Sequence, residues 1–184
     1  QYNGGFNMKN KNYILKFEIL STIFVIILGT LLHFTYKWSG GNFFVSLFSA
    51  VNESTWEHLK LLFYPMLLTT ILGYFYLNKK IPNFLCARLI GILVSLSFTI
   101  IFFYTYTGII GTNFSFIDIS IFFVAVALGE FTSYKIMISN SKCNKYVALI
   151  LIMIIFTCFV VFTYFSPKIG LFKDPITNKY SIQK

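Results

Sequence analysis

Residues 146–165 read YVALILIMIIFTCFVVFTYF, twenty consecutive residues without a charge, and Ser166 and Pro167 follow at once. About 20 apolar residues in a helix are enough to cross the hydrocarbon layer of a bilayer. The residue before a proline is biased away from helical conformation, so this helix should end at 165 or 166. The stretch therefore predicts a transmembrane helix and places the chain in a membrane.

Four further apolar stretches precede it, separated by lysines or by small polar residues. We expect an all-α integral membrane bundle of about five transmembrane helices, at 14–36, 54–78, 84–106, 115–137 and 146–165. Residues 8–165 would form this single domain and 166–184 a C-terminal tail. Residues 1–7 precede Met8 and are interpreted as an upstream or vector-derived extension. Pro65 should kink the second helix or loosen one of its backbone hydrogen bonds.

Residues 42–52 lie between the first two spans and are too few to cross a bilayer. Phe43, Leu47 and Val51 recur at every fourth position, while Ser46 and Ser49 take the other side. This spacing predicts a short amphipathic helix that lies in the interface or dips into the membrane as a re-entrant segment.

Small residues mark where helices should approach one another. Gly91 and Ser95 in the third span, and Ala125 and Gly129 in the fourth, have the four-residue spacing that permits close backbone contact. We expect them to pack inside the bundle and not in a dimer interface.

The composition excludes a water-facing surface, since only 11% of the residues are charged and 57% are hydrophobic, against about 25% charged in soluble domains. A net charge of +9 would suggest nucleic acid in a soluble protein. Here the lysines flank apolar spans, where lipid headgroups and the positive-inside rule account for them. The expected partner is the lipid bilayer, and no nucleic acid is expected.

The basic residues also predict an orientation. They gather at 9–16, 79–88 and 135–145, while 107–113 carries no charge. All three clusters lie on one side if the N-terminus is cytoplasmic, although the lysines of the tail then lie outside. The preference for Lys over Arg, with much Ile, Phe, Asn and Tyr, reflects AT-rich codons and points to a bacterial cell membrane. Cys86, Cys143 and Cys158 lack CxxC spacing and are interpreted as packing thiols without a disulfide.

The densest polar cluster is VNESTWEHLK at 51–60, at the outer mouth of the second span. Ser54 and Glu57 fit a capping box, Trp56 suits an interfacial belt, and Lys60 could reach headgroups or pair with Glu53 or Glu57. That structural interpretation leaves His58 without a role. The candidate binding residues are Asn52, Glu53, Ser54, Trp56, Glu57, His58 and Lys60, joined at the same depth by His33, Asp118 and Tyr36.

His33, His58, Glu53 and Glu57 supply nitrogen and oxygen donors that suit zinc or another divalent transition metal. Their spacing matches no established ligand motif, and the alternative is that each histidine hydrogen-bonds to a neighbour.

Glu130 lies within the fourth span, where a carboxylate costs a few kcal/mol unless it is paired or protonated. Arg88 and Lys16 are its plausible partners, and Glu18 could join them. The arrangement is interpreted either as an ion pair that locks helices together or as a proton or cation relay.

Four segments are distinctive together: HFTYKWSG at 33–40, FSAVNESTWEHLK at 48–60, PML at 65–67, and in the tail Pro167 to Ile169, Leu171, Phe172, Asp174, Pro175, Thr177 and Tyr180. In these segments the chain resembles an uncharacterised family, a domain of unknown function, of small multi-pass membrane proteins from low-GC Gram-positive bacteria. The resemblance implies a stand-alone multi-pass protein and no catalytic residues. The tail would lie on the same side as the cluster at 53–60 and could fold over it.

Three functions remain open. The protein could bind or translocate a small cation or polar solute through Glu53, Glu57, His58 and Glu130. It could be a membrane-embedded metal hydrolase, with Asp118 in support of the ligands. For this alternative the chain is distantly similar to seven-helix membrane hydrolases of the alkaline ceramidase type. Those enzymes hold zinc with three histidines, whereas this chain has two histidines. It could also be a structural or regulatory subunit of a membrane complex.

Overall fold

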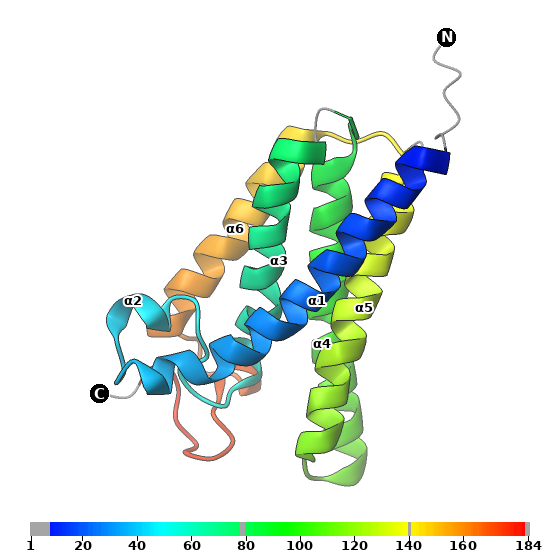
Figure 1. Ribbon diagram of the computed structural model, residues 1–184. Coiled ribbons are helices and arrows are strands. Elements are labelled where there is room, and N and C mark those ends of the chain that lie inside the picture. Colours follow the sequence, from blue (N-terminus) through cyan, green and yellow to red (C-terminus); the bar gives the residue numbers. More distant parts are fainter. Residues whose placement is uncertain (1–7, 78–79, 140, 183–184) are drawn as a thin grey trace.

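The computed structural model describes residues 8–77, 80–139 and 141–182. Over this part of the chain the protein is all-helical (Figure 1), with α1 (Met8–Trp38), α2 (Phe43–Ser46), α3 (Thr55–Leu77), α4 (Phe84–Ile110), α5 (Ser115–Met137) and α6 (Lys145–Tyr164). A short 3₁₀ turn, η1 (Gly170–Phe172), lies in the tail. The interpretation of 1–7 as an extension, and the end of the second helix expected at 78, lie outside the described residues.

Five of these helices are long and apolar enough to cross a membrane, namely Lys11–Trp38, Thr55–Leu77, Phe84–Ile110, Ser115–Met137 and Lys145–Tyr164. The expected five-span bundle is confirmed; the largest differences from the predicted ranges are that α1 begins at Met8 and not at 14, and that α4 ends at Ile110 and not at 106. Helix α4 continues through Gly108 to Ile110 and ends at Gly111, whose backbone is left-handed (φ 83°).

The helices form a bundle in which α1 crosses obliquely over the others, while α4 and α5 run side by side as a hairpin (Figure 1). The beginnings of α1, α4 and α6 and the ends of α3 and α5 lie at one end of the bundle. The opposite end, which we call the mouth, holds α2, the start of α3 and the tail. Large apolar side chains on the outside of the bundle, such as Leu149, Met153 and Phe75, are more than 45% exposed, as lipid contact requires.

The small residues of α4 and α5 meet as expected. A Cβ atom added to Gly91 would lie 2.7 Å from the backbone oxygen of Gly129, and one added to Gly129 would lie 2.6 Å from the oxygen of Gly91. Ser95 donates from Oγ to the Ala125 carbonyl at 2.8 Å. These two helices therefore approach one another through backbone contact inside the bundle.

The expected helix at 42–52 is wrong beyond its first turn. Helix α2 ends at Ser46, and the chain from there to α3 is irregular. Lys60 explains this, because its ammonium donates hydrogen bonds to the carbonyl oxygens of Ser46 at 3.0 Å and Ser49 at 3.4 Å. In a longer helix these carbonyls would accept backbone N–H groups of the next turn instead. The predicted two faces survive: Ser46 and Ser49 are fully buried, while Phe43 and Phe44 point outward.

The expectation of three unlinked thiols is also wrong. Cys86, in the first turn of α4, forms a disulfide with Cys143 in the α5–α6 connection. The two cysteines are 57 residues apart, and only the packing of α4 against the end of α5 brings them together, so sequence spacing could not reveal the pair. Cys158 in α6 remains a free thiol.

Candidate functional site

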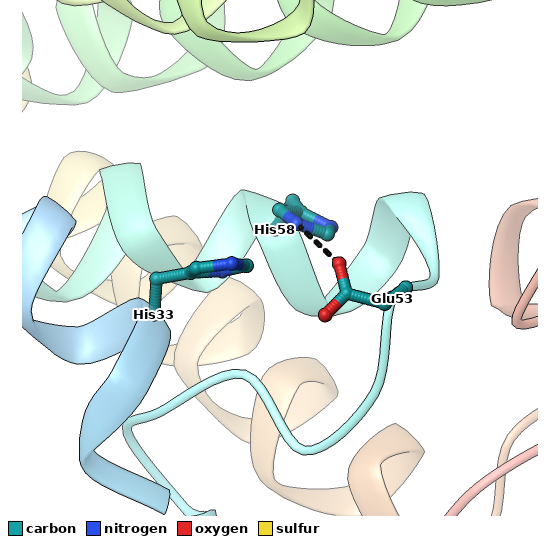
Figure 2. Close-up of side chains that lie close together, drawn as sticks. All are labelled: His33, Glu53 and His58. Carbon is teal, nitrogen blue, oxygen red and sulfur yellow. Dashed lines mark ion pairs between the residues drawn. The ribbon is translucent and has the colours of Figure 1, made fainter. Parts of the chain in front are cut away.

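Three side chains from separate segments converge at the mouth. His33 comes from α1, Glu53 from the connection before α3, and His58 from the first turns of α3 (Figure 2). One ligand atom from each, a ring nitrogen or a carboxylate oxygen, lies within 4.8 Å of the other two. The two imidazole rings are 5.1 Å apart between centroids.

His58 is oriented by its own helix. Its Nδ1 lies 2.9 Å from the Ser54 carbonyl oxygen, which can only accept, so this nitrogen is the one that carries the proton. Its Nε2 faces the carboxylate of Glu53 at 3.4 Å. In a neutral imidazole Nε2 then presents a lone pair to an anion, and a proton or a metal cation must lie between them. A histidine whose second nitrogen donates to a backbone carbonyl is the usual form of a metal ligand.

The spacing is close to that of a metal centre. Tetrahedral zinc with bonds of about 2.0–2.1 Å places its ligand atoms about 3.4 Å apart. The Glu53–His58 separation of 3.4 Å already matches. The ligand atom of His33 lies no more than 4.8 Å from the other two, so it would need to move closer by about 1.4 Å at most to reach the same spacing. Nδ1 of His33 is buried and has no hydrogen-bond partner among the described residues. Such a nitrogen is available to a ligand.

Electrostatics at the mouth favour the ionised carboxylate. The hydrogen bond from His58 lowers the pKa of Glu53, and the positive charge that His58 and His33 can carry acts in the same direction, while partial burial opposes it. An ionised Glu53 is the form that binds a metal.

Glu57 does not join this group. Its carboxylate lies 2.6 Å from Lys60 Nζ, accepts the Val51 N–H at 3.1 Å, and is 3% exposed. Thr163 of α6 donates to it at 3.5 Å. Lys60 is fully buried and so does not extend to headgroups. Of the four predicted metal ligands the structure therefore brings together His33, Glu53 and His58 and gives Glu57 a partner of its own.

The predicted capping box forms only in part. Ser54 Oγ accepts the Glu57 N–H at 3.4 Å, but Glu57 does not return to Ser54. Asn52 takes that place, accepting the Ser54 N–H at 2.9 Å and donating to the Ser181 carbonyl of the tail at 3.2 Å. Asn52 therefore ties the start of α3 to the tail.

Asp118 lies elsewhere. It accepts a hydrogen bond from Tyr106, and another from Asn113 at 3.1 Å, in the hairpin that joins α4 to α5. Position along a helix does not say which neighbour a side chain meets.

The tail covers part of the mouth, as the sequence suggested. Phe172 packs on the Trp56 ring at 4.7 Å between centroids, and Phe159 contacts the same ring at 4.6 Å. Between tail and mouth lies an open cavity of about 290 Å³, lined by Tyr36, Asn52, Glu53, Asp174, Thr177 and Ser181, among others. The tail residues of this cavity were not candidates, because no pattern in 166–184 distinguishes a lining residue from any other loop residue.

The intramembrane charges meet as predicted. Arg88 forms ion pairs with Glu18, at 3.0 Å, and with Glu130. Lys16, the other proposed partner, is exposed.

The chain belongs to a family of unknown function, DUF6512, whose family model matches residues 6–182. Neither a curated protein nor a solved structure matches the chain.

Proposed function

We propose that this protein, a five-span member of a family of unknown function, binds a divalent transition-metal ion at the mouth, with Zn²⁺ as the first choice. His33, Glu53 and His58 are the proposed ligands. Two imidazoles and one carboxylate form a donor set that suits zinc and its neighbours in the first transition series.

The observation that carries this proposal is the convergence of three potential ligands from separate segments, with one ligand atom each from His33, Glu53 and His58 within 4.8 Å of one another. The contact of His58 Nδ1 with the Ser54 carbonyl leaves its other ring nitrogen directed at the Glu53 carboxylate. A purely structural ion pair would need a protonated His58. Such an ion pair would not explain why the imidazole of His33 lies beside His58, since a second group that can carry a positive charge opposes protonation of the first.

We propose binding and not translocation. Glu130, which a relay through the membrane would use, is 2% exposed and is held by Arg88 within the bundle. The set of residues at the mouth has no counterpart of the same kind among the other described residues.

We further propose that the protein lies in a bacterial cell membrane with its N-terminus in the cytoplasm, which places the mouth outside. The lysine clusters at 9–16, 79–88 and 135–145 support this orientation. The Cys86–Cys143 bond argues the other way, since cytoplasmic thiols are mostly kept reduced. Reporter fusions in the connection at 111–114 should respond as extracytoplasmic, and a cytoplasmic response would reverse the proposed orientation.

The direct test is metal content. Protein purified in detergent without chelators, then equilibrated with Zn²⁺ and desalted, should retain about one zinc per chain. His33→Gln and His58→Gln should each lower the affinity by more than the roughly 10–100-fold typical of lost second-shell partners. Asp118→Asn is the matched control, because it removes a carboxylate in another part of the molecule. Equal zinc retention by all four proteins, or none by the wild type, would refute the proposal.

A second candidate function, metal-dependent hydrolysis, is favoured by two observations. Three protein ligands leave a fourth position open, as in catalytic zinc sites, and the cavity of about 290 Å³ reaches Glu53. Zinc-loaded protein should then cleave lipid or peptide esters or amides, and His58→Gln should abolish the activity. Zinc retention without any cleavage would leave metal binding as the function. Failure of both would favour a structural or regulatory subunit.

A further inference from the structure

A second polar centre lies inside the bundle, at the end away from the mouth. Four helices contribute to it: Glu18 from α1, Thr69 and Thr70 from α3, Arg88 from α4, and Glu130 from α5. Arg88 is fully buried, and Glu18 and Glu130 are 3% and 2% exposed. No part of the metal-binding proposal uses these residues.

The donors of Arg88 are all engaged. Nε donates to Thr70 at 3.0 Å, and Nη2 donates to Thr69 at 2.7 Å and to Glu130 Oε1 at 3.2 Å. Nη1 donates to Glu18 Oε2 at 3.0 Å and also to Glu130 Oε2. One nitrogen therefore donates to an oxygen of each carboxyl group, so both carboxyl groups lie against the same end of the guanidinium.

The charges of this centre do not balance. Two carboxyl groups face one guanidinium, and arginine does not lose its proton in proteins. The groups that face the carboxyls are hydroxyls, from Ser21 on α1 and Ser133 on α5, while α3 supplies only its two threonine hydroxyls and the Met66 carbonyl oxygen. Among the described residues, no second cation contacts the centre. One net negative charge inside the membrane would cost several kcal/mol.

We infer that this centre binds one proton, held between Glu18 and Glu130 and resident on Glu18. Glu130 takes the two-pronged contact of Arg88 and a hydrogen bond from Ser21 at 3.0 Å, so it is the better stabilised carboxylate. Glu18 accepts from one nitrogen of Arg88 and from Ser133 at 3.0 Å, and its protonated oxygen would donate to Glu130. A metal cation is disfavoured because the guanidinium occupies the centre.

The proton makes the centre neutral, and its release leaves one uncompensated negative charge among four helices. Folding then takes up a proton that an unfolded, solvated glutamate would not hold at neutral pH. Stability should therefore fall as the pH rises, by about tenfold in the folding equilibrium per pH unit while Glu18 stays protonated. The centre couples protonation to the packing of α1 against α5.

Infrared spectroscopy of the wild-type protein at neutral pH tests this inference without any assay of function. The carbonyl stretch of one protonated carboxyl group should be present and should shift in D₂O. Glu18→Gln and Glu130→Gln should each remove it, because the single remaining carboxylate then balances Arg88. Asp118→Asn, a carboxylate outside the centre, should leave it unchanged.

Absence of the band in the wild type, or its persistence in Glu18→Gln, would overturn the inference. If Glu130→Gln does not fold, Glu18→Gln suffices, since glutamine imitates a protonated carboxyl in shape and charge. The stability of Glu18→Gln should also lack the tenfold-per-unit loss above neutral pH, and an identical pH profile for variant and wild type would contradict the assignment.

Discussion

Two polar pairs lie within two turns of each other at the mouth, and their surroundings differ sharply. The Glu57–Lys60 pair is 3% and 0% exposed, and beyond the ion pair itself these side chains contact backbone groups and Thr163 of α6. The Glu53–His58 pair is 44% and 34% exposed and has a second imidazole beside it. The first pair links α3 to the neighbouring backbone and to α6, whereas the second pair, with His33, leaves potential ligand atoms close to one another and accessible. Buried pairs should therefore control stability, and the open set should control ligand binding.

The largest effect should come from Arg88, a fully buried charge that faces two carboxyl groups. Arg88→Leu leaves two carboxyl groups without a cation and should destabilise the protein by about 3–5 kcal/mol, seen as loss of folded protein or a large fall in the detergent melting temperature. Lys145→Ala, at an exposed position on the same side of the bundle, is the control. A melting temperature for Arg88→Leu equal to that of the control would show that the interior pairs do not hold the helices together.

Lys60→Met should cost about 3 kcal/mol, because it strands the buried carboxylate of Glu57. The double variant Glu57→Leu, Lys60→Met removes both charges. It should recover part of the loss and retain a cost of about 1–3 kcal/mol for the carbonyls of Ser46 and Ser49. Comparing the three melting temperatures separates the ion pair from the backbone contacts. A double variant less stable than Lys60→Met would contradict this division.

Reduction of the disulfide should act at the other end of the molecule. Cys143→Ser, or a reductant on the wild type, should lower stability by about 2–4 kcal/mol, because the bond closes a long loop. Metal affinity at the mouth should not change. If reduction weakened zinc binding, the two ends would be coupled, and treating them as independent regions would be wrong.

The smallest stability effect should come from the open pair. In metal-free protein, Glu53→Gln should cost less than about 1 kcal/mol, as for other exposed pairs. The pKa of Glu53 is lowered by its hydrogen bond with His58, so its contribution is present above the ordinary pKa of a glutamate and disappears as the pH falls through the lowered value. Melting curves of wild type and variant should therefore converge in acid, and a difference that grew in acid would reverse the assignment.

The sequence predicted the five spans because charge and hydropathy respond directly to the membrane. It also predicted Arg88 as a partner of Glu130, since few cations lie at that depth, whereas Lys16, the other cation it proposed, is exposed. It did not predict the end of α2 at Ser46, which depends on the Lys60 ammonium, or the Cys86–Cys143 bond, which depends on tertiary packing.

Within the site, depth along the helices correctly brought His33 to His58. Depth could not separate Glu53 from Glu57, because both lie at the start of α3, Glu53 just before the helix and Glu57 in its first turn. Lys60 decides which of the two carboxylates is available to the histidines, because it lies one turn further along α3 and forms an ion pair with Glu57.

The most direct test of the central claim is the effect of zinc on thermal stability. At a free zinc concentration about 100 times the dissociation constant, wild-type protein should gain about 2.7 kcal/mol. His33→Gln and Glu53→Gln, whose metal-free stabilities should lie close to that of the wild type, should gain almost nothing. A gain of the same size in the variants, or none in the wild type, would show that the open set at the mouth is not a metal site.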